Sequence, residues 1–435
     1  MKVIIMAGGK GTRISSVRND VPKPMIPVAG KPILEWQIAN LKACGLTDIV
    51  IVVGHLGNII MEYFGDGSHY GVKINYFIEE KPLGTAGALF RMPELRDDFL
   101  LMCGDVVLDV DFNRFIEFHK GTKALASLMA HPNGHPYDSS LLVTEVLPPQ
   151  ELGGNPVDTH KVIKWLSKGD ERLYYSNRVN AGIEIVSPKL LQETRKKVMF
   201  YNDNYPNMVD LDRDILKANI STGKIYAYDT PEYIKDMGTP ERYYEVENDI
   251  LTGKLRSRNL KNRQKAVFLD RDGTINKYVG FLTRPEQFEL LDGVTEAIRL
   301  INKSGLLAIV VTNQPVIARG DCTWEQLQLI NMKMETELGK DGCFLDAIYI
   351  CPHHPNRGFK GERLQYKIEC QCRKPKTGLL LQASLDFNID LSQSYMVGDS
   401  DVDVIAGRSC GVKLAVRIKE GGLLQTVKRL LEDKN

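Results

Sequence analysis

A short apolar stretch past the middle of the chain, Ala266–Leu269, runs directly into the sequence Asp270-Arg-Asp272-Gly. The apolar run fits a buried parallel strand, and the two aspartates would then stand at its carboxyl end, where open α/β sheets bind ligands. Two carboxylates in such a place can share one Mg²⁺, and one of them can attack a phosphorus atom. Aspartates also form turns after strands, so the pattern alone leaves both interpretations open. A new first strand at this position requires that a complete domain precedes it.

The length of the chain supports this division, because 435 residues exceed what one ordinary hydrophobic core organises. We expect an N-terminal domain over residues 1–248, a basic linker over 249–265 and a C-terminal domain over 266–435. After Asp249 the linker stretch carries six basic residues and no acidic one, which is typical of a solvated linker or a terminal helix. A nucleic-acid arm, the alternative, would need aromatic or base-reading partners that are absent from the stretch.

Charge and hydropathy argue against two classes of partner. A net charge of +1 with 26% charged residues indicates neither a nucleic-acid partner nor a membrane surface. No apolar run approaches the roughly 18 residues of a membrane span, and the N-terminus resembles a strand entering glycines rather than a signal peptide. We therefore expect a cytoplasmic protein that acts on small molecules; whether it forms a homo-oligomer stays open.

Strand-like runs alternate with amphipathic segments through residues 1–248, which predicts an α/β domain with a largely parallel sheet. The expected strands cover 3–6, 49–53, 74–78 and 99–102, and a helix is expected over 32–43. Glycines follow the first strand, where they let backbone N–H groups approach an anion closely. Arg13 can clamp phosphoryl oxygens, and Lys23 stands between two prolines that fix its backbone. Arg13 and Lys23 therefore look like parts of one polyphosphate site.

The motifs GGKGTR and PKPMIPVAGKP resemble those of the sugar-1-phosphate nucleotidyltransferase family, and the likeness continues through EKPLGTAGA, CGD, NAGI and DMGTPE. The resemblance implies a Rossmann-like domain with a GT-A-like mixed sheet. It also implies the family reaction, in which a sugar phosphate oxygen attacks the α-phosphorus of a nucleoside triphosphate and pyrophosphate leaves. The LGTAGA form is most similar to members that use GTP on mannose-type or heptose phosphates, so GTP is the expected nucleotide.

The same resemblance implies roles for single residues. The nucleotide would be bound by Gly8, Gly9, Gly11, Gly84, Thr85 and Asp105. Arg13 and Lys23 would stabilise charge on the phosphates, because phosphoryl transfer depends mainly on positioning and charge neutralisation. Asn180 would contact the sugar and Lys168 its phosphate, although a serine stands before Lys168 where the family commonly has glutamate. Mg²⁺ would be held by Asp105 with Asp236, or with Asp109 or Asp111 as the alternative partner.

A second, smaller α/β unit is expected beyond Asp270, with strands over 306–312, 345–350 and 395–398 and a helix over 378–387. Polar residues follow these elements, namely Thr312 and Asn313, Lys374, and Asp399. A carboxylate nucleophile cannot approach a phosphate dianion without cations, so Asp270 would need Mg²⁺, a lysine and hydroxyl or amide donors. The residues after the strands supply that set.

This order of motifs resembles the haloacid dehalogenase phosphatases, which implies a Rossmannoid domain. Asp270 would be the nucleophile that forms an aspartyl-phosphate, and Asp272 the acid for the leaving oxygen and then the base for water. Thr312 and Lys374 would bind the transferring phosphoryl group, and Asn313 and Arg373 would contact the substrate. Mg²⁺ would be held by Asp270, the Asp272 backbone carbonyl and Asp399, with Asp403 orienting that shell.

Cysteine spacing points to a structural metal in the same domain. Cys351, His353, Cys370 and Cys372 offer three thiolates and an imidazole in two close pairs, the stoichiometry of a Cys₃His zinc site. His354 is the alternative imidazole. Zinc would pin the loop that carries Arg373 and Lys374.

The motifs DRDGTIN, TNQ, IARG, CPHHP and CxCRKP are similar to the heptose bisphosphate phosphatases, with histidinol-phosphate phosphatases as close kin. The combined resemblance implies a bifunctional enzyme of GDP-heptose biosynthesis. Its C-terminal domain would remove the C7 phosphate of D-glycero-D-manno-heptose 1,7-bisphosphate, and its N-terminal domain would transfer GMP from GTP to the heptose 1-phosphate. The alternatives are a mannose or hexose 1-phosphate nucleotidyltransferase using GTP or UTP, fused to a phosphatase of another ester such as histidinol phosphate or to a regulatory module without turnover.

Overall fold

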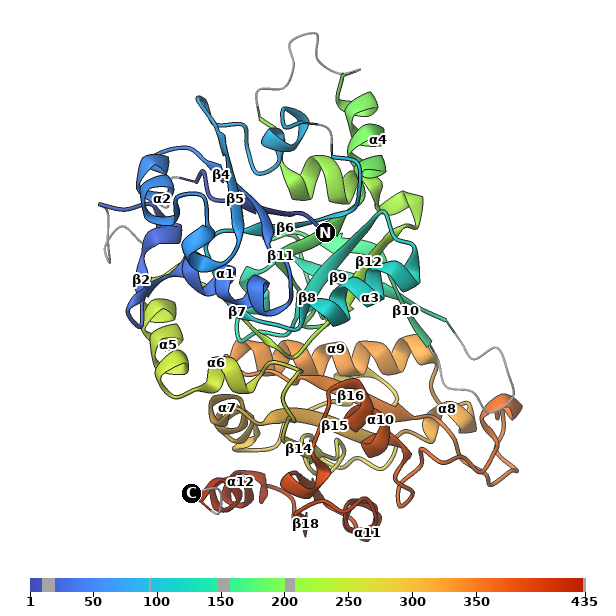
Figure 1. Cartoon of the computed structure of the whole chain (residues 1–435). Coiled ribbons are helices and arrows are strands. Elements are labelled where there is room, and N and C mark those ends of the chain that lie inside the picture. The colour runs from blue at the N-terminus through green and yellow to red at the C-terminus, as the bar shows by residue number, and fades with distance from the viewer. Residues whose placement is uncertain (10–19, 94, 148–156, 200–207, 433–435) are drawn as a thin grey trace. The chain divides into compact units, whose positions relative to one another are not determined.

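The computed structural model of the chain describes residues 1–9, 20–93, 95–147, 157–199 and 208–432 (Figure 1). The fold divides into two compact units, and each is described by itself. The first unit comprises Met1–Ala130, His160–Trp165 and Asn180–Asn259, and the second comprises His131–Thr159, Leu166–Val179 and Leu260–Asn435. None of the described helices is both long enough and apolar enough to cross a membrane.

The larger sheet has nine strands in the order β5-β4-β1-β6-β11-β8-β12-β10-β9. Their bounds are β1 Val3–Met6, β4 Asp48–Val53, β5 Lys73–Ile78, β6 Phe99–Cys103, β8 Ala126–His131, β9 Leu141–Leu147, β10 Val157–Leu166, β11 Val179–Val186 and β12 Ile225–Asp229. Strands β5, β4, β1 and β6 are parallel, whereas β11 runs antiparallel to β6 and β10 antiparallel to β12. Strands β8 and β12 are parallel. The mixed sheet that the family resemblance implies is therefore confirmed, whereas the largely parallel sheet expected from the alternation of elements is limited to β5, β4, β1 and β6 and to this pair.

Helices and short strands complete the N-terminal part. The helices are α1 Ile33–Ala43, α2 Gly57–Phe64, α3 Phe112–Thr122, α4 Pro188–Met199, α5 Pro240–Leu251 and α6 Lys254–Ser257. Helical turns cover Lys23–Met25, Ser68–Tyr70, Gly87–Phe90, Pro136–Asp138, Leu211–Leu216 and Lys217–Thr222. Two pairs of short strands lie outside the larger sheet: β2 Pro27–Val28 with β3 Lys31–Pro32, and β7 Val106–Asp109 with β13 Tyr233–Asp236. Apolar residues of α1, α2 and α3 pack on one face of β1, β4 and β6, which forms the main core of the unit.

The basic stretch after Asp249 is more ordered than a solvated linker. Helix α5 continues through the predicted boundary at 248 to Leu251, and α6 follows directly. Arg258 is buried, and its Nε donates a hydrogen bond to the Pro231 carbonyl oxygen at 3.0 Å. The stretch expected as a basic linker is thus helical up to Ser257 and contains a buried arginine.

The smaller sheet has five parallel strands in the order β16-β15-β14-β17-β18. Their bounds are β14 Ala266–Leu269, β15 Leu307–Asn313, β16 Ala347–Cys351, β17 Tyr395–Gly398 and β18 Leu414–Arg417. Helices α7 Val294–Ser304, α9 Trp324–Lys340 and α12 Leu423–Glu432 bury their apolar residues on one face, and α10 Gly378–Asp386 and α11 Asp401–Ser409 on the other. Shorter helical segments cover Pro285–Gln287, α8 Val316–Arg319, Leu364–Tyr366 and Leu391–Gln393. Because both faces are covered, β14 is apolar throughout and β15 is apolar up to its last two residues, Thr312 and Asn313.

The predicted strands and helices of both parts are found with shifts of one or two residues at their ends. The expected strand over 345–350, for example, is β16 Ala347–Cys351. The capping box at the start of α9 is also present, because the Thr323 side chain accepts from the Gln326 N–H while the Gln326 side chain accepts from the Thr323 N–H. Periodicity and caps are local signals, which explains why they locate elements well.

Candidate active sites

Three neighbouring strands of the smaller sheet end at the same edge. Strand β14 pairs with β17 so that Leu269 lies opposite Val397, and each strand then continues to an aspartate, Asp270 and Asp399. The Asp270 N–H donates to the Val397 carbonyl at 3.0 Å. Strand β15, on the other side of β14, ends with Thr312 and Asn313. The structure thus brings together the polar strand ends that the sequence pattern indicated.

Lys374 reaches this edge from the loop before α10. Its buried Nζ lies 2.7 Å from Asp270 Oδ1 and 2.6 Å from Asp403 Oδ1, and it donates to the Val311 carbonyl at 2.7 Å. Burial lowers the pKa of Lys374, but the two carboxylates outweigh burial and raise it. Burial raises the pKa of Asp270 to about 6, and the Lys374 ammonium opposes that rise. Each of the two groups therefore favours the charged form of the other.

Asn313 holds Lys374 through its backbone. The Asn313 side-chain Oδ1 accepts from the Lys374 N–H and its Nδ2 donates to the Lys374 carbonyl, both at 3.0 Å. These two hydrogen bonds fix the peptide that carries the lysine. The sequence predicts that Asn313 contacts the substrate. In this structure its side-chain amide instead hydrogen-bonds to the backbone of Lys374.

Asp272 is held by three donors. Arg271 donates to both carboxylate oxygens at 3.0 and 3.1 Å, Gln314 Nε2 to Oδ2 at 2.8 Å, and Asn276 Nδ2 to Oδ1 at 3.0 Å. Burial raises the pKa of Asp272, but the Arg271 charge and these hydrogen bonds lower it overall. Gln314 also donates to Thr312 Oγ1 at 2.9 Å. The substrate-free site therefore favours the carboxylate form of Asp272, the form that can accept a proton.

Sequence reasoning missed Arg271 and Gln314 as site residues. Arg271 is fully buried, which is rare for an arginine without a dedicated partner, and its Nη1 also donates to Asn331 Oδ1 at 3.0 Å. The signal in the sequence was a charged residue between two aspartates. Its partner Asn331 on α9 is distant in the chain, so only the structure identifies it.

Carboxylates gather where a cation could bind. One oxygen each from Asp270, Asp399 and Asp403 lies within 4.8 Å of the others. Gly273 makes this approach feasible, because a Cβ there would lie 2.3 Å from Asp399 Oδ2. The carboxylate of Asp272 belongs instead to the Arg271 and Gln314 network, which is compatible with its expected contribution through a backbone carbonyl. Asp403 both faces Lys374 and accepts from the Ser400 hydroxyl at 2.6 Å.

The cysteine and histidine residues expected to bind zinc also come together. Ligand atoms of Cys351, His353, Cys370 and Cys372 lie within 4.8 Å of one another. The sulfur pairs are 3.2 to 3.5 Å apart, too far for a disulfide, and His353 Nδ1 is 3.3 Å from Cys372 Sγ. Hydrogen bonds from Cys351 and then Cys372 lower the pKa of Cys370, which favours a thiolate. His354 is outside this group and contacts the ring of Phe359, so His353 is the histidine that lies with the three cysteines.

Arg373 lies between the cysteine–histidine group and Lys374 in the chain. Its Nη1 donates to the His353 carbonyl at 3.1 Å. In this structure Arg373 therefore braces the loop that carries the metal-type ligands.

The predicted nucleotidyltransferase residues follow strand ends of the larger sheet. Met6 of β1 lies opposite Cys103 of β6, so that Gly8 and Asp105 each stand two residues beyond a paired strand end. In the pair of short strands β7 and β13, Asp236 lies opposite Val106, the residue after Asp105. Register thus places Asp105, which follows the carboxyl end of β6, on a segment adjacent to Asp236, the last residue of β13.

Lys23 and Asp105 form an ion pair in which Nζ and Oδ2 are 2.5 Å apart. The lysine is nearly buried, and the aspartate is more exposed. Asp236 accepts two hydrogen bonds from Arg242 Nη1 at 2.7 and 2.8 Å. Gly11 and Arg13, which are expected to hold and polarise the phosphates, lie outside the described residues.

Several glycines of the expected nucleotide site leave little room for a side chain. A Cβ on Gly8 would lie 2.7 Å from Glu79 Oε2, whereas Gly9 has open space around it. Gly84 has φ +82°, and a Cβ there would lie 2.5 Å from the Val209 carbonyl oxygen. Next to it, Thr85 Oγ1 accepts from the Leu211 N–H at 2.7 Å. The Gly84–Thr85 turn is therefore bound to the segment that begins at 208.

The two residues expected to bind the sugar phosphate have different neighbours. Asn180 Nδ2 donates to Glu184 Oε1 at 3.5 Å, and Lys168 forms an ion pair with Asp138. Glu184 is buried on β11, and burial followed by the nearby Asp212 raises its pKa well above the ordinary value. Sequence reasoning missed Glu184, although a lone glutamate within an apolar strand was a usable signal.

Asp109 and Asp111, the alternatives to Asp236 as the second Mg²⁺ ligand beside Asp105, make other hydrogen bonds. Asp109 Oδ1 accepts from Asn40 Nδ2 at 3.1 Å and from Asn259 Nδ2 at 2.6 Å. Asp111 caps α3 by accepting from the Asn113 N–H at 3.2 Å. Asp236 also accepts hydrogen bonds, from Arg242, and differs from both in lying opposite Val106, the residue after Asp105.

Comparison with known proteins finds two families, which match different parts of the chain. Residues 2–253 match the Nucleotidyl transferase family, and residues 371–419 match the HAD-hydrolase-like family. The D-glycero-beta-D-manno-heptose-1,7-bisphosphate 7-phosphatase of Haemophilus ducreyi is 44% identical over 159 residues, which cover 36% of this chain and 85% of that protein. The protein of the same name from Escherichia coli K12 is 42% identical over 154 residues, covering 35% of this chain and 78% of that protein.

Among solved structures, HddC from Yersinia pseudotuberculosis in complex with GMP-PN matches with a TM-score of 0.44 and 24% identity, covering 57% of this chain and 99% of that chain. The nucleotidyl transferase match covers more than half of the chain, and the 7-phosphatases are matched over most of their own length. The chain therefore belongs to the nucleotidyl transferase family and, through its C-terminal domain, to the family of these haloacid-dehalogenase-type phosphatases, and it is a bifunctional enzyme that combines the two activities.

Proposed function

We propose that the enzyme performs two steps of GDP-heptose synthesis in the cytoplasm. The C-terminal domain hydrolyses the C7 phosphate of D-glycero-D-manno-heptose 1,7-bisphosphate, and the N-terminal domain transfers GMP from GTP to the resulting heptose 1-phosphate. The observation that carries this proposal is a buried Asp270–Lys374 pair in a domain 44% identical to a named heptose bisphosphate 7-phosphatase, within one chain with a nucleotidyl transferase. The phosphatase product is a sugar 1-phosphate, which is the class of acceptor that such transferases use.

In the phosphatase step, Asp270 attacks phosphorus and the bond from phosphorus to the sugar O7 breaks. Asp272 must carry a proton when the bond breaks; it gives that proton to O7 and then takes one from the water that hydrolyses the aspartyl-phosphate, which returns Asp272 to its protonated form. Lys374 and Thr312 hold the phosphoryl oxygens, and Gln314 and Arg271 keep Asp272 in place. The observed distance of 2.7 Å between Lys374 Nζ and Asp270 Oδ1 supports this assignment.

The clustered oxygens of Asp270, Asp399 and Asp403 fit a divalent cation with oxygen ligands. Asp270 and Asp399, with the Asp272 carbonyl, would hold Mg²⁺, and Asp403 would orient them. The cation would neutralise charge on the phosphoryl oxygens. In the N-terminal domain, Asp105 and Asp236 lie on paired segments that suit a second Mg²⁺, while Lys23 and Arg13 neutralise the triphosphate and Gly8 and Gly9 approach it.

The test uses the full-length purified protein with heptose 1,7-bisphosphate, GTP and Mg²⁺, followed by separation of products. We expect inorganic phosphate, pyrophosphate and GDP-heptose. Parallel reactions replace GTP by UTP, the bisphosphate by histidinol phosphate, or heptose 1-phosphate by mannose 1-phosphate. A preference for histidinol phosphate, or failure to convert supplied heptose 1-phosphate with GTP, would reject the corresponding half of the proposal.

The cysteine–histidine group is proposed to bind one structural Zn²⁺. Three sulfurs and one imidazole nitrogen in mutual proximity fit tetrahedral zinc, and a bound zinc would stabilise the loop that precedes Lys374. We expect Cys372→Ser to lower the zinc content from one per chain toward none and the phosphatase kcat/KM by about 10-fold or more. Elemental analysis and both enzyme assays check this, with Cys410→Ser, a cysteine outside the group, as the control. Full phosphatase activity in a zinc-free Cys372→Ser protein would contradict the structural role.

A further inference from the structure

Two segments of the part that matches the nucleotidyl transferase family belong to the same compact unit as the phosphatase domain. These segments are His131–Thr159 and Leu166–Val179, and the second unit contains them together with helix α9. The second segment carries Lys168, which the sequence predicts to bind the phosphate of the sugar. One folded unit therefore contains both an expected transferase residue and a phosphatase helix.

The chain after Lys168 binds side chains near the C-terminal end of α9. The Tyr175 N–H donates to Thr336 Oγ1 at 3.0 Å, and the Asn177 N–H donates to Glu335 Oε1 at 3.2 Å. The bond to Thr336 is buried, where a backbone N–H without a partner is costly. Helix α9 thus provides acceptors for two backbone donors that lie between Lys168 and β11.

A glycine allows α9 to approach the helical turn Pro136–Asp138 closely. A Cβ on Gly339 would lie 2.6 Å from Pro136 Cγ and 3.2 Å from Pro136 Cδ. Gly339 is buried in the last turn of α9 and is not in the left-handed region, so its backbone conformation is one that alanine also adopts. The close contact with the proline ring, rather than the helix itself, therefore explains a glycine at this position.

Arg172 connects the Pro136–Asp138 turn to the residues directly before Lys168. Its guanidinium donates to four backbone carbonyls, those of Pro136 at 3.0 Å, Ser139 at 2.8 Å, Leu166 at 3.2 Å and Ser167. Because the guanidinium is planar and rigid, it fixes these acceptors relative to one another. A displacement of the turn at Pro136 is therefore transmitted to the backbone that carries Lys168.

Lys168 is also paired directly with this turn, through the carboxylate of Asp138. The side chains of Lys168 and Asp138 are 58% and 41% exposed, so their ion pair contributes little free energy and a phosphate dianion can replace the carboxylate. Helix α9 contacts both the turn that contains Asp138 and the chain after Lys168. The position of the Lys168 ammonium thus depends on α9 from two sides.

We propose that α9 of the phosphatase domain positions Lys168 for the phosphate of the transferase's sugar substrate, with Gly339, Thr336 and Glu335 as the positioning residues. The inference rests on the proposed function, because it takes Lys168 as a ligand of the sugar 1-phosphate. Changes on this part of α9 then raise the transferase KM for the sugar 1-phosphate, whereas KM for GTP and phosphate release keep their values.

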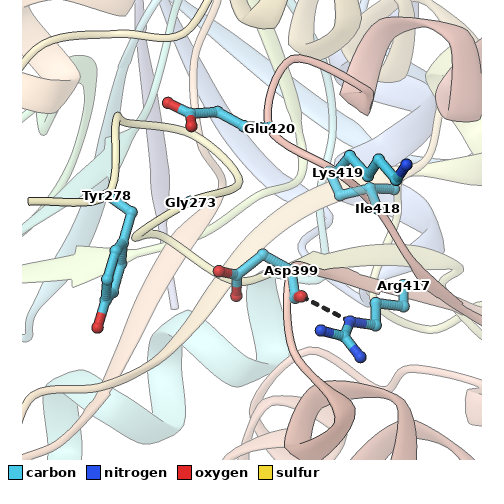
Figure 2. A pocket seen from close by; sticks show the side chains of 7 residues that line it. All are labelled: Gly273, Tyr278, Asp399, Arg417, Ile418, Lys419 and Glu420. Atoms are coloured by element: carbon cyan, nitrogen blue, oxygen red, sulfur yellow. Dashed lines mark hydrogen bonds between the residues drawn. The ribbon is translucent and has the colours of Figure 1, made fainter. Parts of the chain in front are cut away.

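The phosphatase site of the same chain provides an internal reference. A pocket of about 480 Å³ lies beside Asp399, and none of the residues that line it belongs to α9 (Figure 2). Arg417 Nε donates to the Asp399 carbonyl oxygen at 2.9 Å at this pocket, the contact drawn in Figure 2. Helix α9 supports the phosphatase site through Asn331, which accepts from Arg271, and Gly339 lies about two helical turns further along. A substitution at Gly339 therefore leaves these contacts in place.

The main experiment compares both activities of full-length Gly339→Ala, with its metals bound, to those of the wild type. Alanine suits the helix but places a methyl group against Pro136. We expect KM for heptose 1-phosphate to rise about 5- to 20-fold, as for one weakened charge-assisted hydrogen bond, with KM for GTP and phosphate release from heptose 1,7-bisphosphate unchanged. Gly121→Ala is the matched control, because Gly121 lies in α3 with open space around it.

Two further sets of variants test whether α9 acts through Lys168. Thr336→Val keeps the shape of the side chain but removes the acceptor for Tyr175, so it should raise the same KM, whereas Thr336→Ser keeps the hydroxyl and should restore the wild-type value. Lys168→Gln should raise KM for heptose 1-phosphate by itself. Adding Gly339→Ala to Lys168→Gln should raise it no further, because both changes remove the same contact.

The outcomes separate this inference from the function on which it rests. A wild-type protein that does not convert heptose 1-phosphate with GTP would overturn both. A wild-type protein that does convert it, with normal KM in Gly339→Ala and Thr336→Val, would overturn the inference alone, and so would a normal KM in Lys168→Gln or additive effects in the double variant. An equal fall of transferase and phosphatase activity, together with a lower temperature of thermal unfolding, would show that α9 only stabilises the fold.

Discussion

Replacing Asp270 by asparagine is expected to lower phosphatase turnover by about 10⁴-fold or more while the transferase activity of the same chain persists. The amide has nearly the size of the carboxylate but is not a nucleophile, so no aspartyl-phosphate forms. Lys374 keeps Asp403 and the Val311 carbonyl as partners, which should preserve the local fold. Phosphate release and GDP-sugar formation, measured on the same preparation, check the prediction.

The matched control is Asp292→Asn, which changes an exposed aspartate of the same domain. It should leave both activities at the wild-type level. If Asp270→Asn still released phosphate at a rate near that of the wild type, Asp270 would not be the nucleophile. A parallel fall of both activities would instead indicate that the variant had lost its fold.

Replacing Asp105 by asparagine should lower the rate of nucleotidyl transfer by about 10²- to 10³-fold and leave phosphate release intact. The substitution removes the carboxylate that is 2.5 Å from Lys23 and that we assign to Mg²⁺. A weakened metal site should also raise the Mg²⁺ concentration needed for half-maximal rate. Initial rates of pyrophosphate release over a range of Mg²⁺ concentrations measure both effects.

Asp109→Asn serves as the comparison, because Asp109 is the nearest alternative in sequence and already accepts from Asn40 and Asn259. We expect it to lower the thermal stability of the N-terminal domain without changing the Mg²⁺ requirement. The opposite pattern, with a raised Mg²⁺ requirement in Asp109→Asn and a normal one in Asp105→Asn, would assign the metal to Asp109.

Local patterns in the sequence were sufficient to predict most elements and the strand ends on which the candidate sites stand. The apolar run of β14, the polar end of β15 and the aspartate after β17 predicted that Asp270, Thr312 and Asp399 would stand at the same edge, and strand register places them there. Parallel strands share a carboxyl edge, so this conclusion needs only the order of strand and polar residue. Residue patterns alone did not predict which strands of the larger sheet are antiparallel. The alternation of strand-like and helical segments does not specify which strands pair.

By itself the sequence determined the chemical groups of both candidate sites, since the expected nucleophile, the lysine, the metal-type ligands and the glycine turns are each encoded within a few residues. Only the tertiary structure decided which neighbours these groups have. It brought His353 rather than His354 to the three cysteines, placed Arg271 and Gln314 on Asp272, buried Glu184 beside Asn180, and brought Arg417 to the Asp399 carbonyl. Some of these contacts join segments that are distant in the chain, and others depend on the rotamer of a side chain. Strand order and packing determine the distant contacts and the rotamers, and neither can be read from a local sequence pattern.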